Sequence, residues 1–79
     1  MKQDKIPLSS VPEGRYARVV DLFATGTIRR RLQDIGLITG TRVRCLQKSP
    51  SGDPVAYDIR GAVIALRAED SRKILVQYC

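Results

Sequence analysis

The sequence predicts a small, mainly β protein in which about five short strands form a partly open barrel, with one short helix inserted after the first strand. The chain has 79 residues, a length that supports one hydrophobic core. Short runs rich in β-branched and aromatic residues recur along it, separated by turn sequences that contain glycine or proline. One segment instead places its apolar residues at helical spacing, which predicts the helix.

The beginning of the chain predicts a flexible tail over residues 1–7, followed by a single domain over residues 8–79. The tail holds three charges and a proline and has little apolar surface to bury. A turn with Pro12 and Gly14 then leads into the first strand, expected over residues 15–22. Alternation along this strand indicates that Ala17 and Val19 face the core.

The helix is expected to begin at Thr27, whose hydroxyl is suited to capping, and to end near Ile35. Ile28, Leu32 and Ile35 recur at i, i+4 and i+7, so they share one face. Gly36 can adopt the left-handed conformation that a Schellman cap needs just after a helix. In that cap, Leu32 contacts Leu37 across the glycine.

The rest of the chain predicts four more strands. The apolar run over residues 62–67 is expected to be a central strand covered on both faces. A small barrel hides the sheet edges of so short a chain, so we expect an SH3-like barrel, with a five-stranded OB-type barrel as the alternative. The expected elements are strands at 41–47, 55–59, 62–67 and 73–77, a tight turn at Arg60-Gly61, and one helical turn over 68–72, before the last strand.

The sequence favours a protein that is not an enzyme and has no cofactor or metal site. Histidine is absent, which removes the commonest general base and metal ligand. No glycine-rich loop leads from a strand into a helix, so a phosphate site is not indicated. Cys45 and Cys79 are expected to be free thiols. Asp53 and Asp58 are considered as a weak ferrous iron site, but solvated turn carboxylates are the simpler interpretation.

The charge pattern suggests a binding role. The formal net charge is +6, and ten of the fourteen basic residues are arginines, which suit contacts with acidic surfaces. Arg29, Arg30 and Arg31 fan across about 200° of the helix, so at least two must be exposed. They form either a solvated face or a surface for an acidic partner. With no secretory signal and no apolar run of about 20 residues, a cytoplasmic protein without membrane insertion is expected.

Two separated motifs resemble the FeoA family of ferrous iron transport proteins. The first motif runs from Arg30 to Val43 and contains Asp34-Ile35-Gly36-Leu37 and Gly40. The second motif runs from Ser49 to Val55 and continues through Ile59-Arg60-Gly61 and residues 64–67. Thr39 departs from the family pattern, where a proline often precedes the glycine. Gly36, Gly40 and Gly61 are assigned to backbone geometry in turns and at the helix end.

The resemblance implies an SH3-like barrel in the cytoplasm that regulates the FeoB ferrous iron transporter by docking onto its cytoplasmic part, through Arg29, Arg30 and Arg31 in our interpretation. An alternative is a small basic barrel that binds nucleic acid, for which Tyr57 would be the strand aromatic available for stacking. A direct iron chaperone is a third hypothesis. The oligomeric state stays open.

Overall fold

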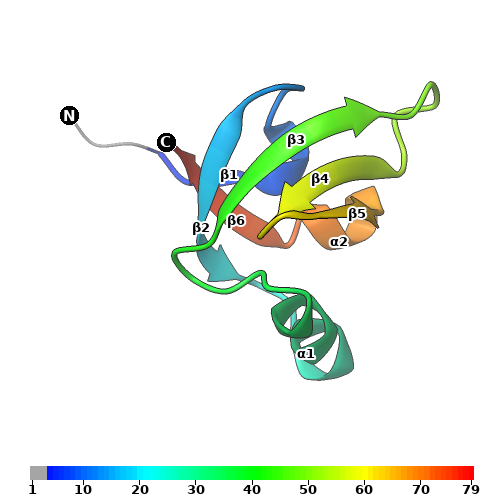
Figure 1. Ribbon diagram of the computed structural model, residues 1–79. Coiled ribbons are helices and arrows are strands. Elements are labelled where there is room, and N and C mark those ends of the chain that lie inside the picture. The colour runs from blue at the N-terminus through cyan, green and yellow to red at the C-terminus, as the bar shows by residue number, and fades with distance from the viewer. Residues whose placement is uncertain (1–3) are drawn as a thin grey trace.

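The computed structural model describes residues 4–79 and contains one antiparallel sheet of six strands, in the order β1–β6–β2–β3–β4–β5. The sheet is strongly curved, and a nine-residue helix projects from one end of it (Figure 1). In chain order the elements are β1 (Ile6–Pro7), a 3-10 turn (Leu8–Ser10), β2 (Tyr16–Leu22), α1 (Gly26–Asp34), β3 (Arg42–Lys48), β4 (Val55–Ile59), β5 (Ala62–Leu66), α2 (Ala68–Ser71) and β6 (Ile74–Tyr78). The mainly β prediction, with its inserted helix and the helical turn before the last strand, is confirmed.

The N-terminal segment is more ordered than the predicted tail. Ile6 and Pro7 form β1 and pair with Val76 and Leu75 of β6, so the prediction of a tail reaching residue 7 is wrong at this end. Ile6 is partly buried against the core, and this burial offsets the cost of ordering the segment. Residues 1–3 of the predicted tail lie outside the described residues.

Strand β5 is an edge strand, and the prediction that it is the central core strand is wrong. It pairs with β4 through the tight turn at Arg60 and Gly61, and with no other strand among residues 4–79. Leu66 is buried, but Val63 is 72% exposed. A run of five apolar residues does not reveal how many neighbours a strand has. The middle of the sheet is occupied instead by β2 and β3, which pair with each other.

The N-cap of helix α1 lies two residues earlier than expected. Its N-cap residue is Thr25, with extended backbone angles and no capping hydrogen bond from its side chain, so Thr27 lies within the first turn. The carbonyl of Thr25 accepts a hydrogen bond from the Arg29 amide at 3.4 Å. The start of the helix differs from the prediction because the first helical hydrogen bond is accepted by the backbone of Thr25, and the Thr27 hydroxyl does not act as the cap.

The end of α1 has both hydrogen bonds of a Schellman cap. The Leu37 amide donates to the Leu32 carbonyl and the Gly36 amide to the Gln33 carbonyl, each at 3.0 Å. Gly36 has a φ of +105°, and a Cβ there would lie 2.8 Å from Cδ of Arg60. The glycine is therefore needed both for the backbone turn and for the close approach of the β4–β5 turn.

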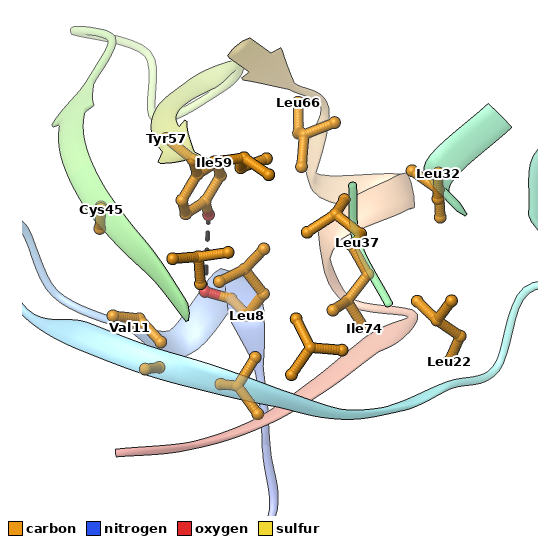
Figure 2. Packing of buried hydrophobic residues seen from close by; sticks show 14 of the residues in the cluster. Leu8, Val11, Leu22, Leu32, Leu37, Cys45, Tyr57, Ile59, Leu66 and Ile74 are labelled. Carbon is orange, nitrogen blue, oxygen red and sulfur yellow. Dashed lines mark hydrogen bonds between the residues drawn. The ribbon is translucent and has the colours of Figure 1, made fainter. Parts of the chain in front are cut away.

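The hydrophobic core lies inside the curve of the sheet (Figure 2). It contains Leu32 and Leu37 from the helix end, and the inward-facing residues of each long strand, as the alternation predicted. Tyr57 is fully buried, and its hydroxyl donates a 3.5 Å hydrogen bond to the Leu8 carbonyl. Together these contacts fix the position of α1 against the sheet.

The two cysteines are free thiols in different environments, and we expect them to react at different rates. Cys45 is buried in β3, whereas Cys79 is exposed. Burial raises the pKa of the Cys45 thiol, so less of the reactive thiolate is present at neutral pH. In a titration with Ellman's reagent, Cys79 should react at once and Cys45 only after denaturation. Rapid reaction of both thiols in the native protein would contradict this packing.

Candidate functional site

The three arginines of α1 are all exposed, but they do not form three equivalent free charges. Arg29 donates from Nη1 to the Leu22 carbonyl at 3.2 Å. Arg31 forms an ion pair with Asp70, with 3.0 Å between Nη2 and Oδ2. The side chain of Arg30 has neither a hydrogen bond nor an ion pair within the described part of the chain. Two of the three guanidinium groups therefore hold the helix in place. The guanidinium group of Arg30 is free to contact another molecule.

The Arg31–Asp70 ion pair lies beside a groove between α1 and the segment formed by β5 and α2. The groove has a volume of about 560 Å³. Its apolar lining comes from both sides, with Ile28 and Ile35 on the helix and Ile64 and Leu66 on the strand. The charged residues that line it are Arg31, Arg67, Glu69, Asp70 and Lys73.

The groove runs along the open edge of the sheet. Among the described residues, β5 hydrogen-bonds to β4 on one side only, so its other side presents unpaired backbone donors and acceptors. No residue of β5 is charged or a proline, so this edge lacks the residues that usually prevent strand pairing. The combination of an open edge and an adjacent apolar groove suits an extended peptide.

The remaining motif residues have structural positions. Leu32 and Leu37 are fully buried. Gly40 has a φ of +94° and donates from its amide to the Val19 carbonyl at 2.7 Å, which fastens the loop after α1 to β2. Gly61 has a φ of +88° in the β4–β5 turn. These positions account for the residue types without a bound ligand.

The groups with shifted pKa values lie in the core, away from the groove. Burial raises the pKa of Tyr57 to about 12 and also raises the pKa of Cys45. The burial of Tyr57 means that it is not available to stack on a nucleic acid base, the role considered for it in the sequence.

The carboxylates considered for iron are engaged in hydrogen bonds with the backbone. Asp53 accepts from the Ala68 amide at 2.8 Å, and Asp58 accepts from the Gly61 amide at 3.0 Å. Within residues 4–79, no group of three or more His, Cys, Asp or Glu side chains is placed to hold a metal ion. The two aspartates thus hold the backbone of turns in place.

Sequence reasoning missed a second group of arginines, on the outer face of the sheet. Arg18 of β2 lies directly opposite Arg42 of β3, and Tyr16 lies opposite Arg44. Arg42 and Arg44 alternate with apolar residues in the sequence, a pattern typical of a strand with one solvent-exposed face. The register that brings Arg18 and Tyr16 beside them depends on the pairing of β2 with β3, which the sequence pattern does not specify.

Comparison with known proteins gives the family. The FeoA domain matches residues 6–78, which is most of the chain. The chain belongs to the FeoA family. This family is involved in ferrous iron transport. The resemblance seen in the two sequence motifs is therefore confirmed.

Three similar proteins illustrate the family. A curated Fe(2+) transport protein A/Fe(2+) transporter FeoB fusion protein from Porphyromonas gingivalis is 34% identical over 70 residues, covering 89% of this chain. The solution structure of a FeoA-like protein from Clostridium acetobutylicum is 31% identical, with a TM-score of 0.88, and the match covers 99% of this chain and 90% of that one. The crystal structure of Stenotrophomonas maltophilia FeoA complexed with zinc is 29% identical, with a TM-score of 0.81, and the match covers 90% of this chain and 88% of that one.

These relatives confirm the SH3-like fold, because the Stenotrophomonas protein is described as a procaryotic SH3 domain protein. The chain spans only 8% of the length of the curated fusion protein, which is far larger than one FeoA domain. Within residues 4–79, neither helix has the length and apolar character needed to cross a bilayer.

Proposed function

We propose that this protein is a regulatory accessory of ferrous iron uptake that acts, without catalysis, by docking onto the cytoplasmic part of the FeoB transporter. The observation that carries the proposal is the fusion relative, in which a FeoA part and a FeoB part share one polypeptide. Tethering keeps two domains at high effective concentration, an arrangement that favours their association. To act on FeoB, a FeoA domain needs a surface that binds it. In this proposal the domain works in the cytoplasm, the compartment where that part of FeoB lies.

The groove beside β5 is the proposed docking surface. An extended segment of FeoB would pair with the open edge of β5 and place alternate side chains against Ile28, Ile35 and Ile64. The backbone hydrogen bonds supply affinity, and the groove selects the side chains. This mode of binding uses the two features of the site that the fold leaves open, an unpaired edge and an apolar lining.

The arginines of α1 are proposed to steer the partner toward this groove. Arg30 carries a charge without a partner in the described chain, and Arg31 lines the groove itself. A net charge of +6 adds a long-range attraction for an acidic surface. Charges at the rim of an interface act mainly on the association rate and its salt dependence, so Arg30 is expected to affect how fast the complex forms.

The proposal is tested by measuring binding of the purified chain to the immobilised cytoplasmic part of FeoB from the same organism. We expect reversible binding that weakens as salt is raised. Arg30→Gln should lower the association rate by roughly two- to fivefold. The matched control is Lys48→Gln, which removes the same charge at the end of β3, remote from α1 (Figure 1), and should leave the rate nearly unchanged.

A second variant separates the edge of β5 from the charge effect. Ala65→Lys places a cation on the edge strand, where it opposes pairing with another strand, and it makes the net charge more positive. We expect an affinity loss of about tenfold or more, because β5 no longer accepts an extended segment. Absence of binding by the folded wild-type chain at both low and moderate salt would overturn the proposed function.

A further inference from the structure

The outer face of β2 and β3 carries a cluster of cations around one aromatic ring. We call Tyr16, Arg18, Arg42 and Arg44 the cationic face. The guanidinium carbon of Arg42 lies 4.1 Å from the centre of the Tyr16 ring, and that of Arg44 lies 5.2 Å from it. The strand residues between these four, such as Ala17 and Val43, point into the core. The cationic face is thus the solvent side of a strand pair whose other side is fixed by packing.

This arrangement is unfavourable for the isolated protein. Arg18 and Arg42 are a directly opposed cross-strand pair of like charge, which destabilises a sheet. Within residues 4–79, none of the three arginines of this face has a carboxylate within ion-pair distance. In addition, Nε of Arg44 is buried and has no hydrogen-bond acceptor. A buried donor without a partner costs free energy, so the fold itself does not explain why these residues are arginines.

Within residues 4–79, no acidic side chain forms an ion pair with the cationic face. Asp58 lies opposite Arg44 on β4, but its carboxylate accepts the Gly61 amide at 3.0 Å. Asp21, on β2 itself, accepts the Leu22 amide at 2.8 Å. Asp70 is paired with Arg31. The positive charge of the outer face is therefore available to a ligand from outside the chain.

We propose that the cationic face is a second binding surface, which takes an acidic segment of a partner protein. Stacking on Tyr16 holds the guanidinium groups of Arg42 and Arg44 in place, so their planar forks are ready to receive carboxylates in a bidentate manner. Arg18 adds a third cation at the position opposite Arg42. A segment with two or three carboxylates would remove the like-charge repulsion that the free protein tolerates.

The partner is a protein rather than a nucleic acid because the aromatic ring is covered by arginines. Tyr16 is 38% exposed and lies under two guanidinium groups, so it does not offer the open ring face on which bases stack. The cationic face also lacks an apolar side chain of the kind that inserts into a bilayer. The inference rests on the proposed function only for the identity of the protein that carries the acidic segment.

The test uses fluorescein-labelled hexaglutamate as the probe and fluorescence anisotropy at low salt as the readout. We expect saturable binding by the full chain, weakened about fivefold or more by Arg42→Gln and by Arg18→Gln. Arg72→Gln, which removes one arginine after α2, is the control and should weaken binding by less than about twofold. The Nε–H resonance of Arg44 should shift on addition of the peptide, because a carboxylate bound at the outer edge of the same guanidinium changes its electrostatic surroundings.

Arg18→Gln offers a second readout that distinguishes a binding role from a structural one. Removing the like-charge pair should raise the Tm by about 1–5 °C while binding falls. A lowered Tm together with unchanged binding would contradict the proposal. Equal losses of binding in the Arg72→Gln and Arg42→Gln variants would also overturn it, because the probe would then respond to net charge alone.

Two further probes test the class of partner. Tighter binding of a single-stranded oligonucleotide, or of vesicles containing phosphatidylglycerol, with the same dependence on Arg42 would overturn the assignment to an acidic protein. Hexaglutamate binding that needs Arg18 and Arg42 supports the inference even where the FeoB fragment does not bind. Failure of the FeoB fragment alone counts against the proposed function, so the two failures are distinguishable.

Discussion

Replacing Leu37 with alanine should lower the free energy of unfolding by about 2–5 kcal/mol, the largest effect that we expect from a single substitution. Leu37 is fully buried and belongs to the same cluster as Leu32 and Ile74 (Figure 2). Its truncation removes buried apolar surface and leaves a cavity at the point where α1 joins the sheet. The total stability of a chain of this size is on the order of 4–12 kcal/mol, so the loss is a large share of it.

Urea denaturation followed by circular dichroism measures the effect of Leu37→Ala. The control is Ile38→Ala, at the next position and 44% exposed, which should change the stability by less than about 0.5 kcal/mol. If Leu37→Ala unfolds the chain completely, Leu37→Val provides a smaller truncation with an expected cost of about 1 kcal/mol. Equal stability of the Leu37→Ala and Ile38→Ala variants would show that the helix end does not pack as described.

Alkaline pH should destabilise the protein through Tyr57, the second largest effect. Burial raises the pKa of Tyr57 to about 12 in the folded chain, from an ordinary value of 10.0. Between these values the unfolded chain loses the phenol proton while the folded chain keeps it, so stability falls as pH rises. The stabilisation that comes from the raised pKa of Tyr57 is complete below about pH 10 and is lost by about pH 12. A difference of two pKa units corresponds to about 2–3 kcal/mol in the free energy of unfolding.

Tyr57→Phe isolates this contribution from the other groups that titrate at high pH. At neutral pH the variant should lose about 0.5–1.5 kcal/mol, because the hydrogen bond to the Leu8 carbonyl is removed. Its stability should then decline less steeply than that of the wild-type chain between pH 10 and 12. Parallel declines in the two proteins would mean that the Tyr57 phenol is not shielded from water.

The sequence predicted which residues face the core wherever polar and apolar residues alternate. In β2 the pattern identified Ala17 and Val19, both of which are buried. It also predicted the cap of α1, because Leu32, Gly36 and Leu37 stand at the spacing of a known local motif. In both cases the information lies within a few residues of the chain.

The errors concern relationships between distant segments. The apolar run of β5 predicts a central strand, but only the pairing of β2 with β6 on one side and β3 on the other decides which strands are central. Ile6 and Pro7 are ordered because they pair with β6, which is about 70 residues away in the chain. Neither relationship leaves a local signal in the sequence.

The candidate site was predictable only in part for the same reason. The sequence identified Arg29, Arg30 and Arg31 as a cationic cluster, but two of them are held by the Leu22 carbonyl and by Asp70. Asp70 lies 39 positions from Arg31. The groove itself is formed by segments that meet only after folding, and so is the cationic face around Tyr16.

The central claim is that this chain docks onto the cytoplasmic part of FeoB, and an NMR titration of the ¹⁵N-labelled chain with that unlabelled part tests it most directly. We predict amide shift changes concentrated in β5 and α1 around the groove, with side-chain Nε–H changes at Arg42 and Arg44. A spectrum that stays unchanged as the FeoB part is added in excess, or one that changes only in β1 and the last residues of β6, would contradict the claim.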